Sequence, residues 1–387
     1  MSLFTSEADR LEKFPVARSQ IFLGHAGVTI LPQCAASAMI KHVQDSCDNH
    51  QEFGTVLRDI ERTRAACAEI IGADKSEIAL LGPTSLGLSL FANGLTWEEG
   101  DELVCYRDDY PSNVYPWTAL AERGVKIRYI TPEKPGQLTI EALEKELTPR
   151  TKLVALASCH YLTGWRIDVP TIGKLLRERG ILFSLDAIQT IGAFPTDVEY
   201  VDFLSADAHK WMLGPMAIGI VYVAKRNFAL CRPTLLGAWN VKSPDFLSTS
   251  EIEFNETAQR YEPGVLNVTG MYGMKASLDM LSELGIGRVS EAILEVRDYL
   301  DLALRDLGFE FLSPPVSERL RCGIVTARHP QADSTRLFNA LESNKITASL
   351  RRERETGLWL RFSPHFYNTK AEMDKVIAVL REQVAGA

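Results

Sequence analysis

ILFSLDAIQ at residues 181–189 and SADAHKWMLGP at residues 205–215 decide how this chain folds. The first stretch is an apolar run that ends at Asp186, which is the pattern of a buried strand. In the second, Lys210 follows a short apolar strand and precedes Gly214-Pro215, so we expect it on a turn. The spacing leaves room for one crossover and one strand between Asp186 and Lys210, which predicts that the two side chains lie at neighbouring strand ends.

The alternation of short apolar runs with helical segments extends outward from residue 72 to about residue 225. Continuous apolar strands separated by helices are typical of a mainly parallel sheet covered by helices on both faces. Ligands of such α/β sheets bind beyond the carboxyl ends of the strands. The predicted strands are Glu77–Leu81, Glu102–Tyr106, Lys126–Ile130, Leu153–Ser158, Ile181–Asp186, Phe203–Ala206 and Ile218–Val223, with helices such as Thr139–Leu147 and Pro170–Arg179 between them.

The pattern along the whole chain predicts that the protein has three parts. Residues 1–33 are an irregular arm, residues 34–285 form a large domain that opens with a helical run over 34–71, and residues 286–387 form a small α+β domain. The small domain is predicted from a long helical pattern followed by alternating strands and helices. Its predicted elements are Arg288–Leu307, Cys322–Ala327, Ser334–Asn344, Leu358–Phe362 and a last helix that opens with a capping box at Thr369.

Composition and net charge limit the classes of protein to which this chain can belong. The 387 residues carry a net charge of −8, which argues against a nucleic-acid partner because phosphate binding needs clustered Lys and Arg. No apolar stretch reaches the roughly 18 residues of a membrane helix, and the N-terminus lacks the apolar core of a secretory signal. The seven cysteines are scattered and form no C-x-x-C pair, so we expect reduced thiols in a cytoplasmic protein, without a metal site.

Lys210 and Asp186 together suggest cofactor chemistry. A lysine at a strand end can form a Schiff base if partial burial lets its amine lose a proton near neutral pH. Taken alone, Lys210 is better explained as a solvated loop lysine. A carboxylate at Asp186 points into the ligand crevice, where it would pair with the protonated ring nitrogen of pyridoxal phosphate. The alternative is that Asp186 caps a following helix.

Gly82-Pro83-Thr84-Ser85-Leu86-Gly87 follows the first predicted strand and opens a helix. Backbone N–H groups and small hydroxyls at a helix N-terminus form an anion site, which suits a cofactor phosphate. Plain N-capping by Thr84 or Ser85 explains the turn equally well. Nucleotide-binding fingerprints are absent from the sequence.

These segments together resemble the class V, fold-type I family of pyridoxal-phosphate enzymes. That family includes cysteine desulfurases, selenocysteine lyases, isopenicillin N epimerase-like proteins and kynureninases. The resemblance runs nearly end to end, from FLGHAGVTILP at residues 22–32 to LRFSPHFYN at residues 360–368. It implies a homodimer with shared active sites, an amino acid substrate, and an N-terminal arm that contributes to the small domain and the active-site entrance.

The resemblance also implies a role for each matched residue. Lys210 would carry pyridoxal 5′-phosphate as a Schiff base, and Arg361 would bind the substrate carboxylate through a bidentate pair. The other matched residues would bind the cofactor: its phosphate through Thr84, Ser85 and His209 with Asp207 behind it, its ring nitrogen through Asp186, its ring face through Tyr110, and its phenolic oxygen through Gln189 and His160.

The chain departs from the family in two places. Desulfurases carry a loop cysteine shortly before the carboxylate arginine, but SLRRERETGLWLR at residues 349–361 has none. The nearest, Cys322, lies on a predicted strand, so desulfurase activity through a persulfide is not expected. In YEPGVLN at residues 261–267, Val265 stands where a Thr usually reaches the neighbouring subunit's phosphate.

We therefore expect an enzyme that acts on an amino acid, with transamination as the first choice. A β-lyase acting on a sulfur- or selenium-bearing amino acid and an epimerase remain open, because all three begin by removing the α-proton. A catalytically inactive ligand-binding homologue is the alternative from another class. The loops around Trp239, Asn240 and residues 351–355 are expected to set the substrate side chain.

Overall fold

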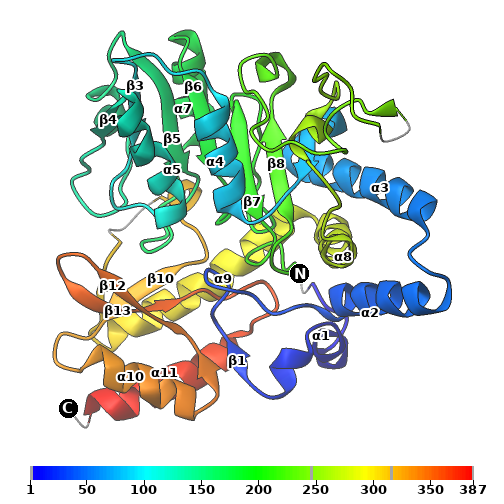
Figure 1. The fold of residues 1–387 in the computed structure, drawn as a ribbon. Helices are drawn as coiled ribbons and strands as arrows, with labels where there is room; N and C mark the ends of the chain where they lie inside the picture. Colours follow the sequence, from blue (N-terminus) through cyan, green and yellow to red (C-terminus); the bar gives the residue numbers. More distant parts are fainter. Residues whose placement is uncertain (1–2, 245–246, 314–316, 386–387) are drawn as a thin grey trace.

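A computed structural model describes residues 3–244, 247–313 and 317–385 of the chain. A seven-stranded sheet forms the centre of the large domain (Figure 1). Its strands lie in the order β2-β8-β7-β6-β5-β3-β4. They are β2 (Ile78–Leu80), β3 (Glu102–Cys105), β4 (Lys126–Tyr129), β5 (Thr151–Ala157), β6 (Leu182–Asp186), β7 (Phe203–Asp207) and β8 (Gly219–Val223), which confirms the α/β fold predicted from the apolar runs.

The five strands from β3 to β7 run parallel, whereas β8 pairs antiparallel with both β7 and β2. Strands β6 and β7 are direct neighbours, with Asp186 opposite Ser205 in the register. Both strands therefore end at the same edge of the sheet. The turn that follows β7 carries Lys210, so the amine and the Asp186 carboxylate come from adjacent strand ends.

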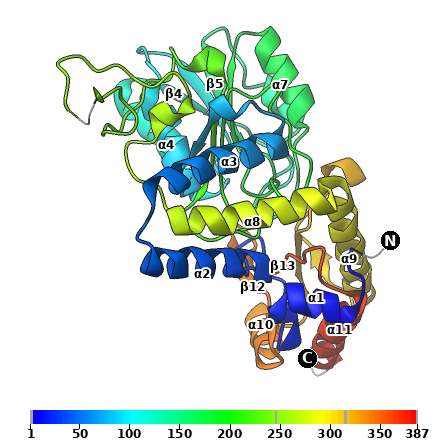
Figure 2. The same ribbon diagram turned by 90° about the vertical axis from the view of Figure 1, so that its right-hand side faces the viewer.

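Helices cover both faces of this sheet (Figure 2). One face is covered by α4 (Thr84–Gly94) and α5 (Tyr115–Thr118); Phe91 of α4 stacks on Phe203 of β7 with ring centres 5.0 Å apart. A second and larger apolar core lies on the other face. It is supplied by α3 (Phe53–Ile71), α7 (Val169–Glu178), α8 (Val268–Leu284) and α6 (Ile140–Glu144).

The helical run predicted over residues 34–71 is two helices, α2 (Gln33–Asp48) and α3. The prediction that 34–71 is helical throughout was wrong at residues 49–52, where the backbone leaves the helical conformation. His50 has a left-handed φ of 49°, and the Glu52 carboxylate accepts hydrogen bonds from the Gly54 and Thr55 N–H groups to start α3. The break turns α2 away from the sheet to pack along α8.

The small domain contains a four-stranded antiparallel sheet in the order β12-β13-β10-β9. Long helices pack on it, with Leu300 and Leu360 in a shared core. Its elements are α9 (Ile286–Asp306), β9 (Glu310–Phe311), β10 (Val325–Arg328), α10 (Ser334–Ser343), β11 (Ile346–Thr347), β12 (Ser349–Glu353), β13 (Gly357–Phe362) and α11 (Lys370–Ala385). The sequence pattern had not predicted β12.

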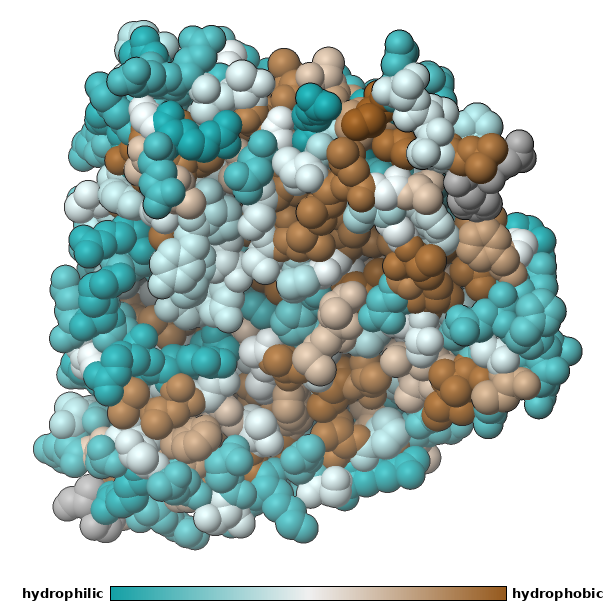
Figure 3. Space-filling model, in the orientation of Figure 1, coloured by the Kyte–Doolittle hydropathy of each residue, from teal (hydrophilic) through white to brown (hydrophobic). Residues whose placement is uncertain are grey.

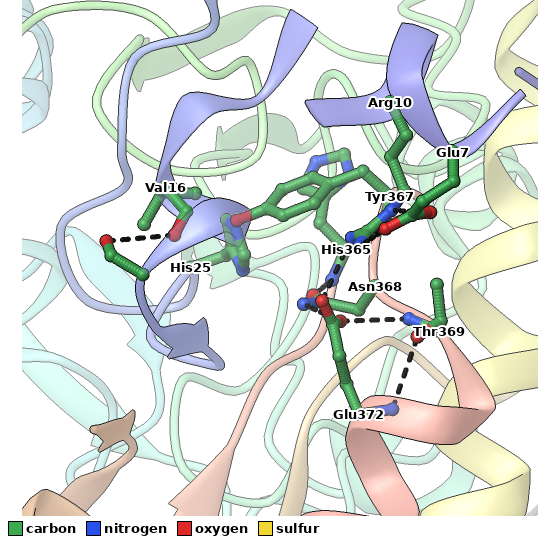
Figure 4. A network of polar contacts seen from close by, with 10 residues as sticks. Glu7, Arg10, Val16, His25, His365, Tyr367, Asn368, Thr369 and Glu372 are labelled. Carbon is green, nitrogen blue, oxygen red and sulfur yellow. Dashed lines mark hydrogen bonds and ion pairs between the residues drawn. The ribbon is translucent and has the colours of Figure 1, made fainter. Parts of the chain in front are cut away.

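The N-terminal arm is fastened to the small domain. It contains α1 (Glu7–Lys13) and β1 (Ile21–Phe22), and β1 pairs in parallel with β11. Arg10 donates hydrogen bonds to the Tyr367 carbonyl (3.0 Å) and to Glu372 (2.9 Å) in the buried polar network of Figure 4. His25 bonds the Ser363 carbonyl and the Tyr367 hydroxyl. These contacts hold the residues that follow His25 beside the sheet edge; the division at residues 33 and 285 remains our proposal.

Among the residues that the structure describes, no helix is both long enough and apolar enough to cross a bilayer.

Candidate active site

A cavity of about 310 Å³ lies beyond the carboxyl ends of β6 and β7, between the sheet, the arm and the small domain. Residues from stretches far apart in the chain meet there. Its walls are formed by Ala26, Gly27, Val28, Pro83, Thr84, Ser85, Tyr110, Ser112, Tyr161, Asp186, Ile188, His209, Lys210, Arg351 and Arg361. Seven of the ten residues predicted for the site, those other than His160, Gln189 and Asp207, line this one cavity.

Lys210 is buried, with 7% of its surface exposed. Burial lowers the pKa of its amine to about 8, against the raising effect of the Asp186 charge, and the Arg361 and Arg351 charges lower it further. Its Nζ lies 5.3 Å from the centre of the Tyr110 ring. The interpretation of Lys210 as a solvated loop lysine is therefore wrong, and about a tenth of its amine is unprotonated at pH 7.

Asp186 is the last residue of β6 and is buried beside Lys210. Its Oδ1 accepts a hydrogen bond from the Ile188 N–H at 3.1 Å. The residues after it form turns rather than a helix, so a helix-capping role is wrong. Burial raises the pKa of the Asp186 carboxyl to about 7, and the charge of Asp109 adds to this effect. A protonated nitrogen placed beside this carboxyl would favour its ionised form.

The predicted phosphate turn lies at the N-terminus of α4, where Thr84 and Ser85 line the cavity. The Thr84 hydroxyl accepts a hydrogen bond from the Asp207 N–H at 2.9 Å, and the Thr84 carbonyl accepts one from the Ser205 hydroxyl at 3.0 Å. These bonds tie the start of α4 to the end of β7. The free N–H groups of the first helical turn and the Ser85 side chain are thereby available to an anion.

His209 lines the same end of the cavity. Its Nδ1 is hydrogen-bonded to Asp207 Oδ1, while the other carboxylate oxygen, Oδ2, is buried without a hydrogen-bond partner. Asp207 thus holds the imidazole of His209 from behind. The second ring nitrogen of His209 remains free to donate to an anion.

Besides Asp207, two predicted residues do not line the cavity. Gln189 uses its amide to donate to the Ala26 carbonyl (3.2 Å) and to accept from the Trp211 indole N–H (2.7 Å). The ring of His160 is bonded to Thr163 and to the Asp108 carbonyl, on the wall of a neighbouring cavity.

Tyr161, the next residue after His160, lines the candidate cavity instead. Tyr161 begins the turn over residues 161–163, and the two neighbouring side chains enter the site differently, with only Tyr161 lining the candidate cavity. The sequence contained no signal that separates His160 from Tyr161. Their rings are 5.0 Å apart, centre to centre.

Arg361 lies on β13 and is 1% exposed. Its Nη1 donates to the Tyr161 carbonyl at 2.7 Å, but its Nε and Nη2 are buried without hydrogen-bond partners. Burial and the nearby Arg351 charge lower the pKa of the Arg361 guanidinium to about 9. Burying a guanidinium with two unpaired N–H donors costs free energy unless an anion accepts hydrogen bonds from them. This end of the cavity therefore suits a carboxylate.

The sequence model of the family described as Aminotransferase class-V matches residues 21–376. The chain belongs to the class V aminotransferase family. Enzymes of this family use pyridoxal phosphate, and the donors in the cavity fit that cofactor: a buried amine, a buried carboxylate and an anion-binding helix end. The orphaned Asp207 Oδ2 and Arg361 nitrogens are the kind of incomplete polar sites that bound anions and waters satisfy.

Other members of the class V family resemble the chain along most of their length. A probable cysteine desulfurase of Pyrococcus abyssi is 26% identical over 97% of each chain. The isopenicillin N epimerase of Streptomyces clavuligerus is 27% identical over 82% of this chain and 83% of that protein. In three dimensions, the apo structure of cysteine desulfurase from Thermococcus onnurineus NA1 covers 100% of both chains, with a TM-score of 0.91 and 24% identity. The structural match shows the same fold, and the names of the two relatives denote different reactions.

The cysteines of this class V member are all free thiols. Among the described residues, no cysteine lines the cavity. Cys322 is 1% exposed and precedes β10 rather than forming part of it, because the strand begins at Val325. The hairpin of β12 and β13, where desulfurases were expected to carry their cysteine, presents Arg351 to the cavity instead.

Proposed function

We propose that the chain is a pyridoxal-phosphate-dependent aminotransferase that acts on an α-amino acid. The observation that carries this proposal is that the Lys210 amine and the Asp186 carboxylate, from neighbouring strand ends, face one buried cavity. Retention of both groups, together with the unpartnered guanidinium of Arg361, speaks against an inactive ligand-binding homologue.

When bound, pyridoxal phosphate supplies an aldehyde that joins amines and an electron-poor ring that accepts the charge left by the departing α-proton. In our proposal Asp186 would hold the ring nitrogen, Tyr110 would contact the ring, and the α4 N-terminus with His209 would hold the phosphate. Lys210 Nζ would carry the covalent link in the resting enzyme, and, once the substrate amine has displaced it, the free Lys210 amine would take the proton from the substrate Cα as general base. Arg361 fixes the substrate through its carboxylate.

Transamination is proposed over desulfuration because the cavity offers an amine base but no thiol that could receive sulfur, among the residues described. A β-lyase is the second candidate. It is favoured by the phenol of Tyr161, a proton donor on the cavity wall that could protonate a leaving group, and by the desulfurases among the relatives, which also break a carbon–sulfur bond. Epimerisation is kept as a third outcome, on the strength of the epimerase relative.

The test of the shared chemistry is reductive trapping. Purified protein loaded with pyridoxal phosphate is reduced with borohydride, digested and mapped by mass spectrometry. We expect a pyridoxyl adduct on Lys210, and an adduct elsewhere or none at all overturns the proposal. A screen of amino acids that follows keto acid, released sulfide and stereochemical inversion in parallel then separates the three reactions.

We further propose that the protein is a homodimer in which a second copy covers the apolar side chains around the site. Figure 3 shows apolar residues gathered across the middle and right of the face that carries the cavity. Val28, Met216 and Val265 are all more than half exposed, and Val265 reaches 73%. Val265 lacks the hydroxyl that the family places there, so only its backbone N–H could reach the partner's phosphate. Sedimentation of the holoenzyme should give twice the mass of one chain.

A further inference from the structure

The cavity contains a second arginine, and no role in the proposed reaction uses it. Arg351 lies on β12, and Ser349 on the same strand pairs with Arg361 of β13. Residues two apart on a strand share a face, so Arg351 and Arg361 project from the same side of the hairpin as diagonal neighbours. A Cβ placed on Gly27 would lie 3.5 Å from Arg351 Nη2 and 3.6 Å from Arg361 Nη2. The two guanidiniums therefore reach the same part of the wall.

Arg351 has no ion-pair or hydrogen-bond partner within the described residues. Two charged neighbours on this hairpin already have partners. Glu353 accepts hydrogen bonds from the Glu355 N–H and from the N–H and hydroxyl of Thr356. Arg354 pairs with Asp108 at 2.7 Å. Arg351 and Arg361 are the two charged residues of the hairpin that line the cavity, and neither has a counter-ion among the described residues.

The cavity contains more cationic side chains than the proposed reaction uses, and Arg351 is the one without a role. Its lining residues include the cations Lys210, Arg351 and Arg361 but a single carboxylate, Asp186. In the proposed function Lys210 and Asp186 are both engaged by the cofactor, and Arg361 takes the α-carboxylate of the substrate. Burial and, after it, the charge of Arg351 lower the pKa of Arg361, and two cations on one wall favour the binding of anions there.

We propose that Arg351 binds a second anionic group, carried on the substrate side chain, so that the preferred substrates are α-amino acids with an acidic side chain. This inference rests on the proposed function and assigns its substrate class. A carboxylate, a sulfinate or sulfonate, and a phosphate share the required chemistry, because each offers charged oxygens to a guanidinium. An uncharged side chain would leave Arg351 unpaired beside Arg361.

The test compares a dianion with a monoanion of the same length on the holoenzyme. Glutarate and pentanoate are titrated by calorimetry into wild type, Arg351→Gln and Arg352→Gln. Arg352 is the matched control, because it is the next residue on β12 and lines the neighbouring cavity rather than this one. For Arg351→Gln we expect glutarate affinity to fall about tenfold or more and pentanoate affinity to change less than about twofold, as for loss of one charge-assisted contact.

Arg352→Gln should leave both affinities within about twofold of wild type, because Arg352 lines the neighbouring cavity and not the one that holds the ligand. Equal weakening of glutarate and pentanoate by Arg351→Gln, or no weakening of either, would overturn the inference. Kinetics with aspartate, cysteate and phosphoserine then identify which acidic group is preferred.

Borohydride trapping on the same preparations separates this inference from the proposed function. The adduct on Lys210 does not depend on Arg351. If the adduct forms while Arg351→Gln leaves glutarate binding intact, the substrate class alone is wrong. If no adduct forms in wild type, the proposed function itself fails.

Discussion

The indole N–H of Trp211 donates a 2.7 Å hydrogen bond to the side-chain oxygen of Gln189. Trp211 follows Lys210 directly, and Gln189 lies three residues after Asp186. The bond therefore joins the two turns that hold the amine and the carboxylate, inside a fully buried part of the fold. It gives Gln189 a role in positioning these turns that the sequence had not indicated.

Trp211→Phe should destabilise the protein by about 2 to 4 kcal/mol, because it creates a small cavity and leaves the Gln189 oxygen buried without a donor. Chemical denaturation measures this loss. In the double variant with Gln189→Leu the two costs should not add, since the orphaned oxygen is gone. Full additivity would show that the hydrogen bond contributes nothing.

Lys210→Ala should abolish turnover and borohydride trapping while the protein still folds. The amine is buried and carries no hydrogen bond among the described residues, so its loss removes a desolvated charge rather than a structural contact. Circular dichroism and a thermal melt check the fold. Lys174→Ala, at an exposed site on α7, is the control that should keep full activity. Wild-type turnover by Lys210→Ala would mean that another base carries the reaction.

Arg361→Gln should raise KM for amino acid substrates and lower kcat/KM by about 10- to 100-fold, because one charge-assisted carboxylate contact is lost. Steady-state kinetics with the true substrate measure both constants. Pyridoxal phosphate content should stay unchanged in this variant. An unaltered KM would place the substrate carboxylate elsewhere in the cavity.

Covalent capture of pyridoxal phosphate by the apoenzyme should depend on pH through Lys210. Only the neutral amine reacts, and burial lowers the pKa of this amine to about 8. Below that pH the protonated form dominates, so the capture rate should rise about tenfold for each pH unit and level off above about 8. Stopped-flow absorbance follows the reaction. A plateau reached only near the ordinary lysine pKa would contradict the assigned environment of Lys210.

Alkylation of the native holoenzyme with iodoacetamide should modify Cys47 and leave turnover unchanged. Cys47 is exposed and Cys34 half-buried, whereas the other five cysteines are buried. Burial raises the pKa of the Cys67, Cys105 and Cys231 thiols to about 12, which keeps them unreactive. Peptide mapping identifies the modified residue. Inactivation that follows the labelling of any one thiol would instead indicate a nucleophilic cysteine.

The inner strands of the large sheet were predictable because they are mostly apolar and bounded by turn residues. A strand that is buried on both faces needs apolar residues at successive positions, so the pattern can be seen in the sequence. Strand β12 was missed for the opposite reason. Its residues Arg351 and Arg352 are exposed and charged, and pairing with β13 rather than local preference makes them extended. The break between α2 and α3 was missed because the residues of the loop, 49–52, include no Gly or Pro.

The sequence by itself determined the layered α/β fold, the family, and the adjacency of Asp186 and Lys210, because all three depend on patterns and spacings along one continuous stretch. Tertiary structure alone decided that Tyr161 rather than His160 lines the cavity, that Gln189 is bound to Trp211, and that Arg351 stands unpaired beside Arg361. Those outcomes depend on which way a side chain turns and on partners distant in the chain, and neither is encoded in local composition.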